Sequence, residues 1–229
     1  MGKNITKDYK KTADNTVKMV DTKDKQTAEK LELDDRIYSL SRREAFITLK
    51  DHKSNFENNP TCRLLNPAKS KLGKVSQKIL ARVVAQLRTK TKLNSWKNTH
   101  SVIDWFKNLK DKNTLSFIMF DICEFYPNIT EEILRKALIY AKKHTNITQQ
   151  EIDIILSTKS GLLFNGKQAW NKKGNTAFDV TMGSWDGAEV CDLIGLYLLS
   201  QLSDMNLEIS LYRDDALAET ASRPRQTEI

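Results

Sequence analysis

The stretch "LYRDDALAE" (residues 211–219) sets two adjacent aspartates, Asp214 and Asp215, behind a tyrosine and an arginine, with apolar residues on both flanks. The residues just before it, "LEISLY" (207–212), predict a short strand that ends at this acidic pair. From these residues alone two interpretations stay open. The pair is either a solvated turn between edge strands, where aspartate is common, or a site that holds a cation.

A second predicted strand also ends in an aspartate. The segment "TLSFIMFDICEFYPNI" (114–129) is dense in branched and aromatic residues, which predicts a buried strand that runs into Asp121 and then into a proline turn. If the two strands lie side by side, the three carboxylates converge at one edge of a sheet. Such a cluster either raises a pKa steeply or requires a cation, and Mg²⁺ prefers carboxylate oxygens together with substrate phosphates. Two such ions suit in-line displacement at phosphorus.

The rest of the chain alternates between helical patterns and short strands. Apolar residues recur every fourth position from Val75 to Leu87, which predicts an amphipathic helix over 73–90. Further helices are predicted over 101–110, from Thr130 to Lys143, from a Thr148 to Glu151 capping box onward, and over 188–202. Strand signals occur in "AFITLKDHK" (45–53) and around the Asn165-Gly166 hairpin turn. This order indicates an α+β fold with mostly antiparallel strands.

The amino-acid composition bears on the kind of binding partner and on the cellular location of the protein. The chain has 229 residues and a formal net charge of +8, which is compatible with an anionic partner without requiring one. Its three cysteines are far apart and odd in number, so we expect a reducing, intracellular location rather than a disulfide framework. The three histidines share no zinc-ligand spacing, and no apolar run approaches the length of a membrane span.

Several motifs, in a consistent order, resemble those of reverse transcriptases. Residues 212–215, Tyr-Arg-Asp-Asp, resemble the Tyr-x-Asp-Asp turn of that family, and "FDICEFYPNI" (120–129) resembles its first catalytic motif. Between them, "TMGSWDGAEVCDLIGLYLL" (181–199) resembles the second motif, a Gly-Ser turn that opens a helix. Upstream, "ITLKDHK" (47–53) and "CRLLNPAKSKLG" (62–73) resemble the fingers segment. Over about residues 45–218, the amino-acid sequence most resembles the polymerase segment of retroelement-derived open reading frames in animal genomes.

The resemblance implies a fold and a division of the chain. We expect a polymerase-type palm, an antiparallel sheet backed by helices, with a partial fingers subdomain and no thumb. Residues 1–45 are then a polar, partly helical leader, 46–113 a fingers-like segment, and 114–229 a palm that is truncated after the Tyr-x-Asp-Asp turn. Since the chain ends fourteen residues after Asp215, we expect no room for the palm strands that follow this turn in the family.

The resemblance also assigns roles to individual residues. Asp121 and Asp214 are expected to bind two Mg²⁺ ions, or Mn²⁺, with help from Asp215 and from the backbone carbonyl of Ile122. Tyr126 is expected to lie under the sugar and exclude a 2′-hydroxyl, although a role as an aromatic core residue stays open. The remaining nucleotide-binding and primer-side candidates are Lys50, Arg63, Met182, Gly183, Ser184 and Tyr212, with Lys53 in reserve.

The activity that the resemblance implies is RNA-directed DNA synthesis. A primer 3′-hydroxyl attacks the α-phosphate of a deoxynucleoside triphosphate, on an RNA or DNA template. The alternatives are a non-catalytic nucleic-acid-binding remnant and, third, a metal-dependent nuclease. The sequence departs from the family pattern at Arg213, where a small or apolar residue is usual. A cation there is able to pair with a catalytic carboxylate and weaken metal binding. Met182 stands where glutamine is common, and the proline that usually follows the Gly-Ser turn is absent.

Overall fold

The structure, a computed structural model, describes residues 3–4, 45–52, 56–58, 60, 62–67, 70–110, 112–159, 163–165, 168–171, 178–203 and 208–221. The leader predicted over residues 1–45 lies almost wholly outside the described residues. The described part is a mixture of helices and small antiparallel sheets. This confirms the predicted α+β class at that level of detail.

Each helix predicted from the sequence is present. The helices are α2 Lys71–Thr91, α3 Thr99–Asn108, α4 Phe125–Asn128, α5 Glu131–His144, α6 Gln149–Ser157 and α7 Gly187–Leu202, with a 3₁₀ turn at Lys112–Thr114. The predicted caps are formed, because the Thr130 hydroxyl accepts from the Ile133 N–H and the Thr148 to Glu151 capping box is complete. Local polar signals therefore set where these helices begin.

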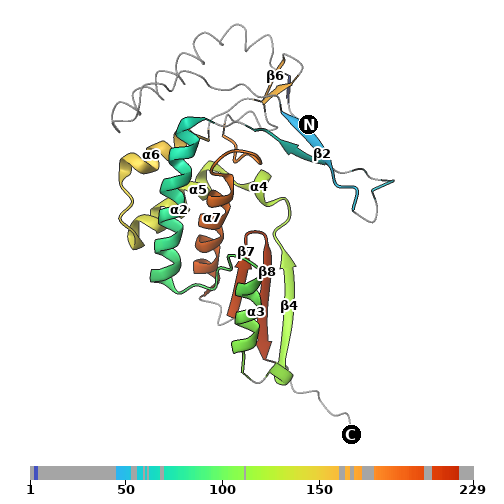
Figure 1. The fold of residues 1–229 in the computed structure, drawn as a ribbon, viewed down its shortest axis with the longest axis vertical. Helices are drawn as coiled ribbons and strands as arrows, with labels where there is room; N and C mark the ends of the chain where they lie inside the picture. The colour runs from blue at the N-terminus through green and yellow to red at the C-terminus, as the bar shows by residue number, and fades with distance from the viewer. Residues whose placement is uncertain are drawn as a thin grey trace.

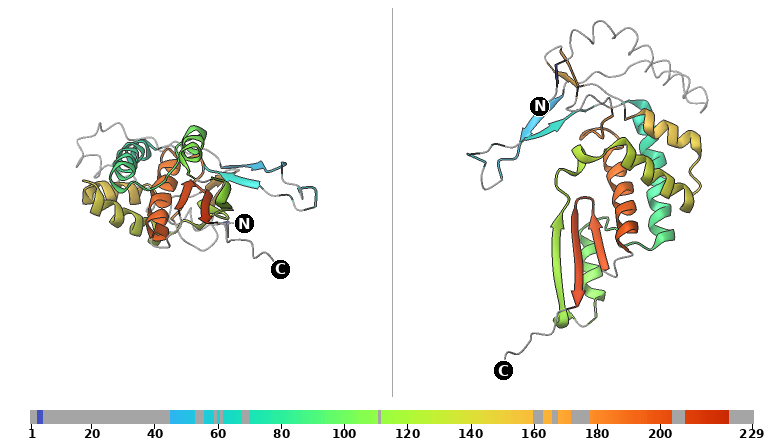
Figure 2. Two further views of the ribbon diagram at one scale, coloured as in Figure 1. Left: turned by 90° about the horizontal axis from the view of Figure 1, so that it is seen from below. Right: turned by 180° about the vertical axis from the view of Figure 1, so that it is seen from behind.

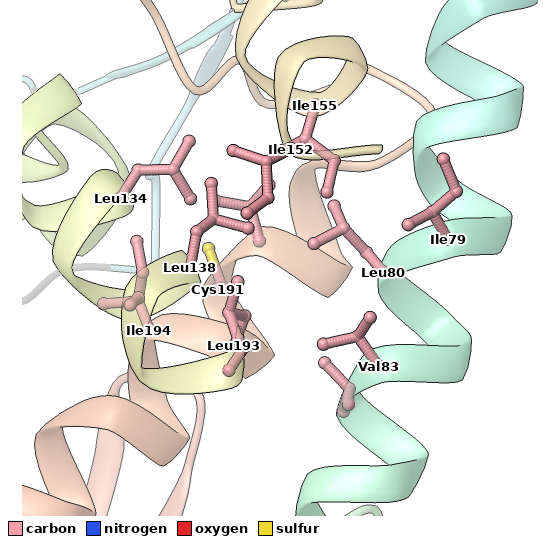
Figure 3. Packing of buried hydrophobic residues seen from close by; sticks show 14 of the residues in the cluster. Ile79, Leu80, Val83, Leu134, Leu138, Ile152, Ile155, Cys191, Leu193 and Ile194 are labelled. Atoms are coloured by element: carbon pink, nitrogen blue, oxygen red, sulfur yellow. The ribbon is translucent and has the colours of Figure 1, made fainter. Parts of the chain in front are cut away.

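Helices α2, α5, α6 and α7 form a bundle around one apolar core (Figure 1). Side chains from all four helices point toward one another in Figure 3, among them Leu80, Leu138, Ile155 and Ile194. Helix α7 is central, and it is apolar on most of its surface because neighbours cover it on several sides. No helix in the described part of the chain is long and apolar enough to cross a membrane.

Beside the bundle lies an antiparallel sheet of β4 Leu115–Asp121, β8 Asp215–Ala221 and β7 Glu208–Tyr212, in the order β4-β8-β7 (Figure 2). This order corrects two predictions. The two strands that end in aspartate are not neighbours, because β8 lies between them. A strand does follow the Tyr-x-Asp-Asp turn, since β8 begins at the second aspartate of the pair.

Strand β4 is not buried, contrary to the sequence prediction. It is an edge strand, and Ile118 and Met119 are 53% and 85% exposed. Helix α3 lies against one face of the sheet, where the rings of Trp105 and Phe117 are 6.3 Å apart. A run of branched and aromatic residues indicates a strand, but it does not indicate how many of its sides are covered.

Two smaller sheets complete the described fold. Strands β2 Phe46–Leu49 and β3 Cys62–Leu65 pair as a hairpin, and β6 Gln168–Asn171 pairs with both β5 Leu163–Asn165 and β1 Lys3–Asn4. The predicted hairpin near Asn165 is confirmed, but Asn165 is the last residue of β5. Residues 166 and 167, which follow it, lie outside the described residues.

Candidate active site

The sheet register brings the three acidic residues to one end of the sheet. Asp121 is opposite Asp215 in the β4–β8 ladder, and the Ile122 N–H donates to the Asp214 carbonyl at 2.9 Å. This bond makes Asp121 and Asp215 a non-hydrogen-bonded pair, for which Cα atoms are about 4.5 Å apart and side chains share a face. Residues separated by almost a hundred positions thus meet where the sequence predicted, whereas their catalytic roles stay predictions.

The three carboxylates act on one another electrostatically. Partial burial raises the pKa of Asp215 above its ordinary value of 3.8, and the negative charges of Asp214 and Asp121 raise this pKa further. The side chain is nevertheless open to solvent at the mouth of the site. An ionised Asp215 is therefore in an unfavourable field that a cation would relieve.

The acidic residues of this cluster suit an Mg²⁺ ion that binds together with a substrate phosphate. They are less suited to a closed site in which the protein supplies every ligand. Among the residues that the structure describes, no group of three or more His, Cys, Asp and Glu side chains is arranged to hold a metal ion. Mg²⁺ commonly binds through one or two carboxylates and completes its shell with waters and substrate phosphates. Asp121 and Asp215, which lie opposite one another, supply two such carboxylates, and Asp214 lies in the adjoining turn as a third acid.

Because the carboxylates of this cluster repel one another, we predict that Asp215→Asn stabilises the folded protein at neutral pH. The folded-state pKa is raised, so between 3.8 and that pKa the folded chain binds more protons than the unfolded chain. Stability therefore falls as pH rises through this window, and the cost persists above it. We expect a higher urea midpoint for Asp215→Asn at pH 7 and no difference near about pH 3. The exposed Asp104→Asn serves as control, and a lower midpoint for Asp215→Asn at pH 7 would contradict the expectation.

The turn between β7 and β8 contains Arg213 and Asp214, and Arg213 has a positive φ of 57°. Its guanidinium lies 5.5 Å from the ring centre of Tyr212, the last residue of β7. The carboxylate that Arg213 reaches is not one of the catalytic candidates. Its Nε lies 3.9 Å from Oδ1 of Asp192 on α7. The ion-pair contact of Arg213 is thus with an acid on α7.

Tyr126, on the short helix α4, lies between the core and the acidic cluster. Burial raises the pKa of its hydroxyl well above 10, and the neighbouring thiol of Cys191 raises this pKa further. The same burial raises the pKa of Cys191 to about 12. The charges of Arg213 and Asp214 also act on Tyr126. The tyrosine therefore packs on the core and stands beside the candidate site, which is compatible with both roles considered for it.

The turn before α7 holds Met182, Gly183 and Ser184 against the end of β3. The Met182 carbonyl accepts from the Asn66 N–H at 3.0 Å, and the Ser184 hydroxyl donates to the Thr181 carbonyl at 2.9 Å. Gly183 has a φ of 104°, and a Cβ there would lie 3.2 Å from the Asn66 carbonyl oxygen. Only glycine fits this backbone without strain. The glycine of the Gly-Ser pair is therefore required by the close approach of the turn before α7 to the end of β3.

The predicted phosphate-binding cations lie on the β2–β3 hairpin. Lys50 directly follows β2 and is half-buried, while Arg63 is exposed on β3 and is in register with Thr48. Lys53 lies outside the described residues. The roles of Lys50 and Arg63 in binding a triphosphate stay predictions.

Sequence reasoning missed a buried charge pair next to the Gly-Ser turn. Lys159 Nζ lies 2.5 Å from Oδ2 of Asp186, the N-cap residue of α7, and both side chains are 1% exposed. Hydroxyls of Ser76 on α2 and Thr158 at the end of α6 donate to the same carboxylate. No local signal marks this pair, because a lysine after a helix and an aspartate in a turn are both common on surfaces.

The fold is similar to solved telomerase structures. The similarity to apo telomerase from Candida tropicalis truncated from its C-terminal domain has a TM-score of 0.56 at 15% identity, covering 82% of this chain and 45% of that chain. Apo telomerase from Candida tropicalis gives 0.53 at 16% identity, covering 65% and 31%. Telomerase from Candida tropicalis in complex with the TWJ fragment of telomeric RNA gives 0.50 at 17%, covering 64% and 28%.

These similarities define the class of fold in coarse outline. The described chain has a reverse-transcriptase-like fold, and it spans less than half the length of the telomerase chains that it matches. No protein-family model matches the sequence, and no curated protein matches it. At this level of identity the likeness concerns the fold alone, so activity has to be argued from the site.

Proposed function

We propose that this chain forms part of an RNA-directed DNA polymerase domain that transfers nucleotides to a primer 3′-hydroxyl. The observation that carries the proposal is the β4–β8 register, which sets Asp121 opposite Asp215 and leaves Asp214 in the adjoining turn. The reverse-transcriptase-like fold supports the same assignment. The proposal keeps the division into a fingers-like segment over 46–113 and a palm over 114–229.

In this proposal the acidic cluster holds the divalent ions and the surrounding residues orient the nucleotide. Carboxylates of Asp121 and Asp214, with the Ile122 carbonyl, bind Mg²⁺ or Mn²⁺, and Asp215 supports them. When bound, such ions activate the attacking hydroxyl and stabilise the leaving pyrophosphate.

Tyr126 lies under the sugar and disfavours a 2′-hydroxyl. The Met182–Ser184 turn lines the nucleotide site, Tyr212 the primer side, and Lys50 and Arg63 attract the triphosphate.

The partners that follow are polyanions. A template strand, a primer and deoxynucleoside triphosphates all suit a chain with a formal net charge of +8. We propose an intracellular location and an origin in a retroelement, both on the strength of the sequence alone. One of the similar telomerase structures is a complex with a fragment of telomeric RNA, and this supports nucleic acid as the general class of partner.

A primer-extension assay tests the proposal. We expect the wild-type chain to extend a labelled DNA primer on an RNA template with Mg²⁺ and deoxynucleoside triphosphates, and to stop when the metal is chelated. Asp214→Ala is expected to abolish extension while leaving duplex binding almost unchanged. The proposal fails if the wild-type chain adds no nucleotide under these conditions with either Mg²⁺ or Mn²⁺.

A non-catalytic nucleic-acid-binding role is the second candidate. It is favoured by the formal net charge of +8, which suits a nucleic-acid backbone whether or not the aspartates hold a metal ion. It predicts that wild type and Asp214→Ala bind duplex with the same dependence on salt and that neither extends a primer. The two candidates are thus separated by a single pair of proteins.

A further inference from the structure

A second acidic residue is positioned to control Arg213. Asp192 lies on α7, directly after the buried Cys191. Its Oδ2 accepts from Arg88 Nη2 at 3.2 Å, and its Oδ1 lies 3.9 Å from Arg213 Nε. The Arg88 and Asp192 side chains are only 16% and 23% exposed, so this part of the contact is shielded from solvent.

Arg88 fixes Asp192 in place. This arginine is in the last turn of α2, where its guanidinium also donates to the Ser95 hydroxyl at 3.2 Å and 3.3 Å. The segment after α2 is itself tied to β7, because the Trp96 N–H donates to the Leu211 carbonyl at 2.9 Å. Asp192 therefore stands on a rigid support made of two helices and the strand that leads into the Tyr-x-Asp-Asp turn.

Arg213 is less firmly held and stands directly before the acidic pair. Its side chain is 40% exposed, and its buried Nε has no hydrogen-bond partner, so the 3.9 Å approach to Asp192 is an ion-pair contact only. Without the charge on Asp192, the acids closest to Arg213 along the chain are Asp214 and Asp215. A guanidinium that pairs with either one occupies ligand oxygens and repels a divalent cation.

We propose that Asp192 is a positioning residue that holds Arg213 away from Asp214 and Asp215 and so keeps these carboxylates available to a divalent cation. The inference rests on the proposed function, since it concerns the same site. It also accounts for an arginine at a position where the sequence alone indicates interference with metal binding. The arginine is tolerated because an acid on the neighbouring helix engages it.

Mn²⁺ binding to the full chain, followed by electron paramagnetic resonance of the free ion, tests the proposal without requiring catalysis. We expect Asp192→Asn to weaken Mn²⁺ binding about fivefold, since a unit positive charge moves to within a few ångströms of the ion. The double variant Asp192→Asn with Arg213→Ala is expected to bind within about twofold of wild type. Arg88→Met removes the residue that fixes Asp192 but keeps the charge of the carboxylate, so it is expected to weaken Mn²⁺ binding less than Asp192→Asn does.

Each outcome decides between the alternatives. A purely structural role for Asp192 predicts that the double variant binds as weakly as Asp192→Asn, and this result would overturn the inference. Equal Mn²⁺ affinity of wild type and Asp192→Asn would overturn it as well, while leaving the proposed function standing if primer extension is observed. If neither wild type nor Arg213→Ala binds Mn²⁺, both the inference and the proposed metal site fail.

Discussion

Lys159→Met is expected to lower the free energy of unfolding by about 3–5 kcal/mol, because it leaves the Asp186 carboxylate buried without a counter-charge. Burial lowers the pKa of Lys159, and the adjacent Asp186 opposes this shift. Both groups depend on each other for charge compensation in a place where water does not reach. Methionine fills a similar volume, so the loss is expected to come from the charge rather than from a cavity.

A second variant separates charge from packing. Asp186→Asn added to Lys159→Met removes the stranded charge and keeps an acceptor for the Ser76 and Thr158 hydroxyls, so at least about half of the lost stability is expected to return. The control is Lys136→Met, whose partner Glu132 is one turn away on the surface of α5. It is expected to leave the urea midpoint near that of wild type. A single variant as stable as this control would refute the prediction.

The buried pair also has a place in the architecture of the site. Asp186 joins α2 through Ser76 and the end of α6 through Thr158 and Lys159, and it is the residue from which α7 starts. The Met182–Ser184 turn comes just before it. The Asp186 carboxylate thus ties this turn to the helical bundle. Helix α7 continues from there toward the β7–β8 turn and packs closely against β7, because a Cβ on Gly195 would lie only 3.0 Å from Leu211 Cδ2.

Those features that depend on neighbouring residues in the chain were predictable. Helix starts at Thr130 and Thr148 follow from side chains that reach backbone N–H groups three residues away. The end of β4 at Asp121 and the tight turn after Tyr212 were predicted from short patterns as well. The convergence of the acids was predicted too, but on the assumption that the two strands ending in aspartate are neighbours, whereas β8 lies between them.

Features that depend on which surfaces meet were not predictable. Nothing in the sequence of β4 shows that it is an edge strand, and nothing in residues 215–221 outweighed the expectation that the palm stops at the turn. Strand order is a tertiary property, since the same residues pair equally well with either neighbour. The Arg213 contact with Asp192 was missed for the same reason, because the partners are brought together only by the packing of α7 beside β7.

Asp121→Asn is expected to reduce the rate of nucleotide incorporation by at least about a thousandfold. The substitution keeps the size of the side chain and removes the charge that a divalent ion requires at this position. It also removes one of the two negative charges that raise the pKa of Asp215, so the folded state is expected to be at least as stable as wild type at pH 7. Single-turnover extension on an RNA template and urea unfolding of the same preparations measure the two effects.

The combination of lost activity and retained stability is what distinguishes a catalytic acid from a structural one. Neutralising a carboxylate that supports the fold lowers both stability and activity, as expected for Asp186. Neutralising one of several carboxylates that repel one another at a site lowers activity only. Asp104→Asn, on the exposed surface of α3, is the matched control and is expected to change neither quantity. Should Asp121→Asn extend primers within about tenfold of the Asp104 variant, Asp121 does not bind the catalytic metal, and the convergence of acids at Asp215 has another cause.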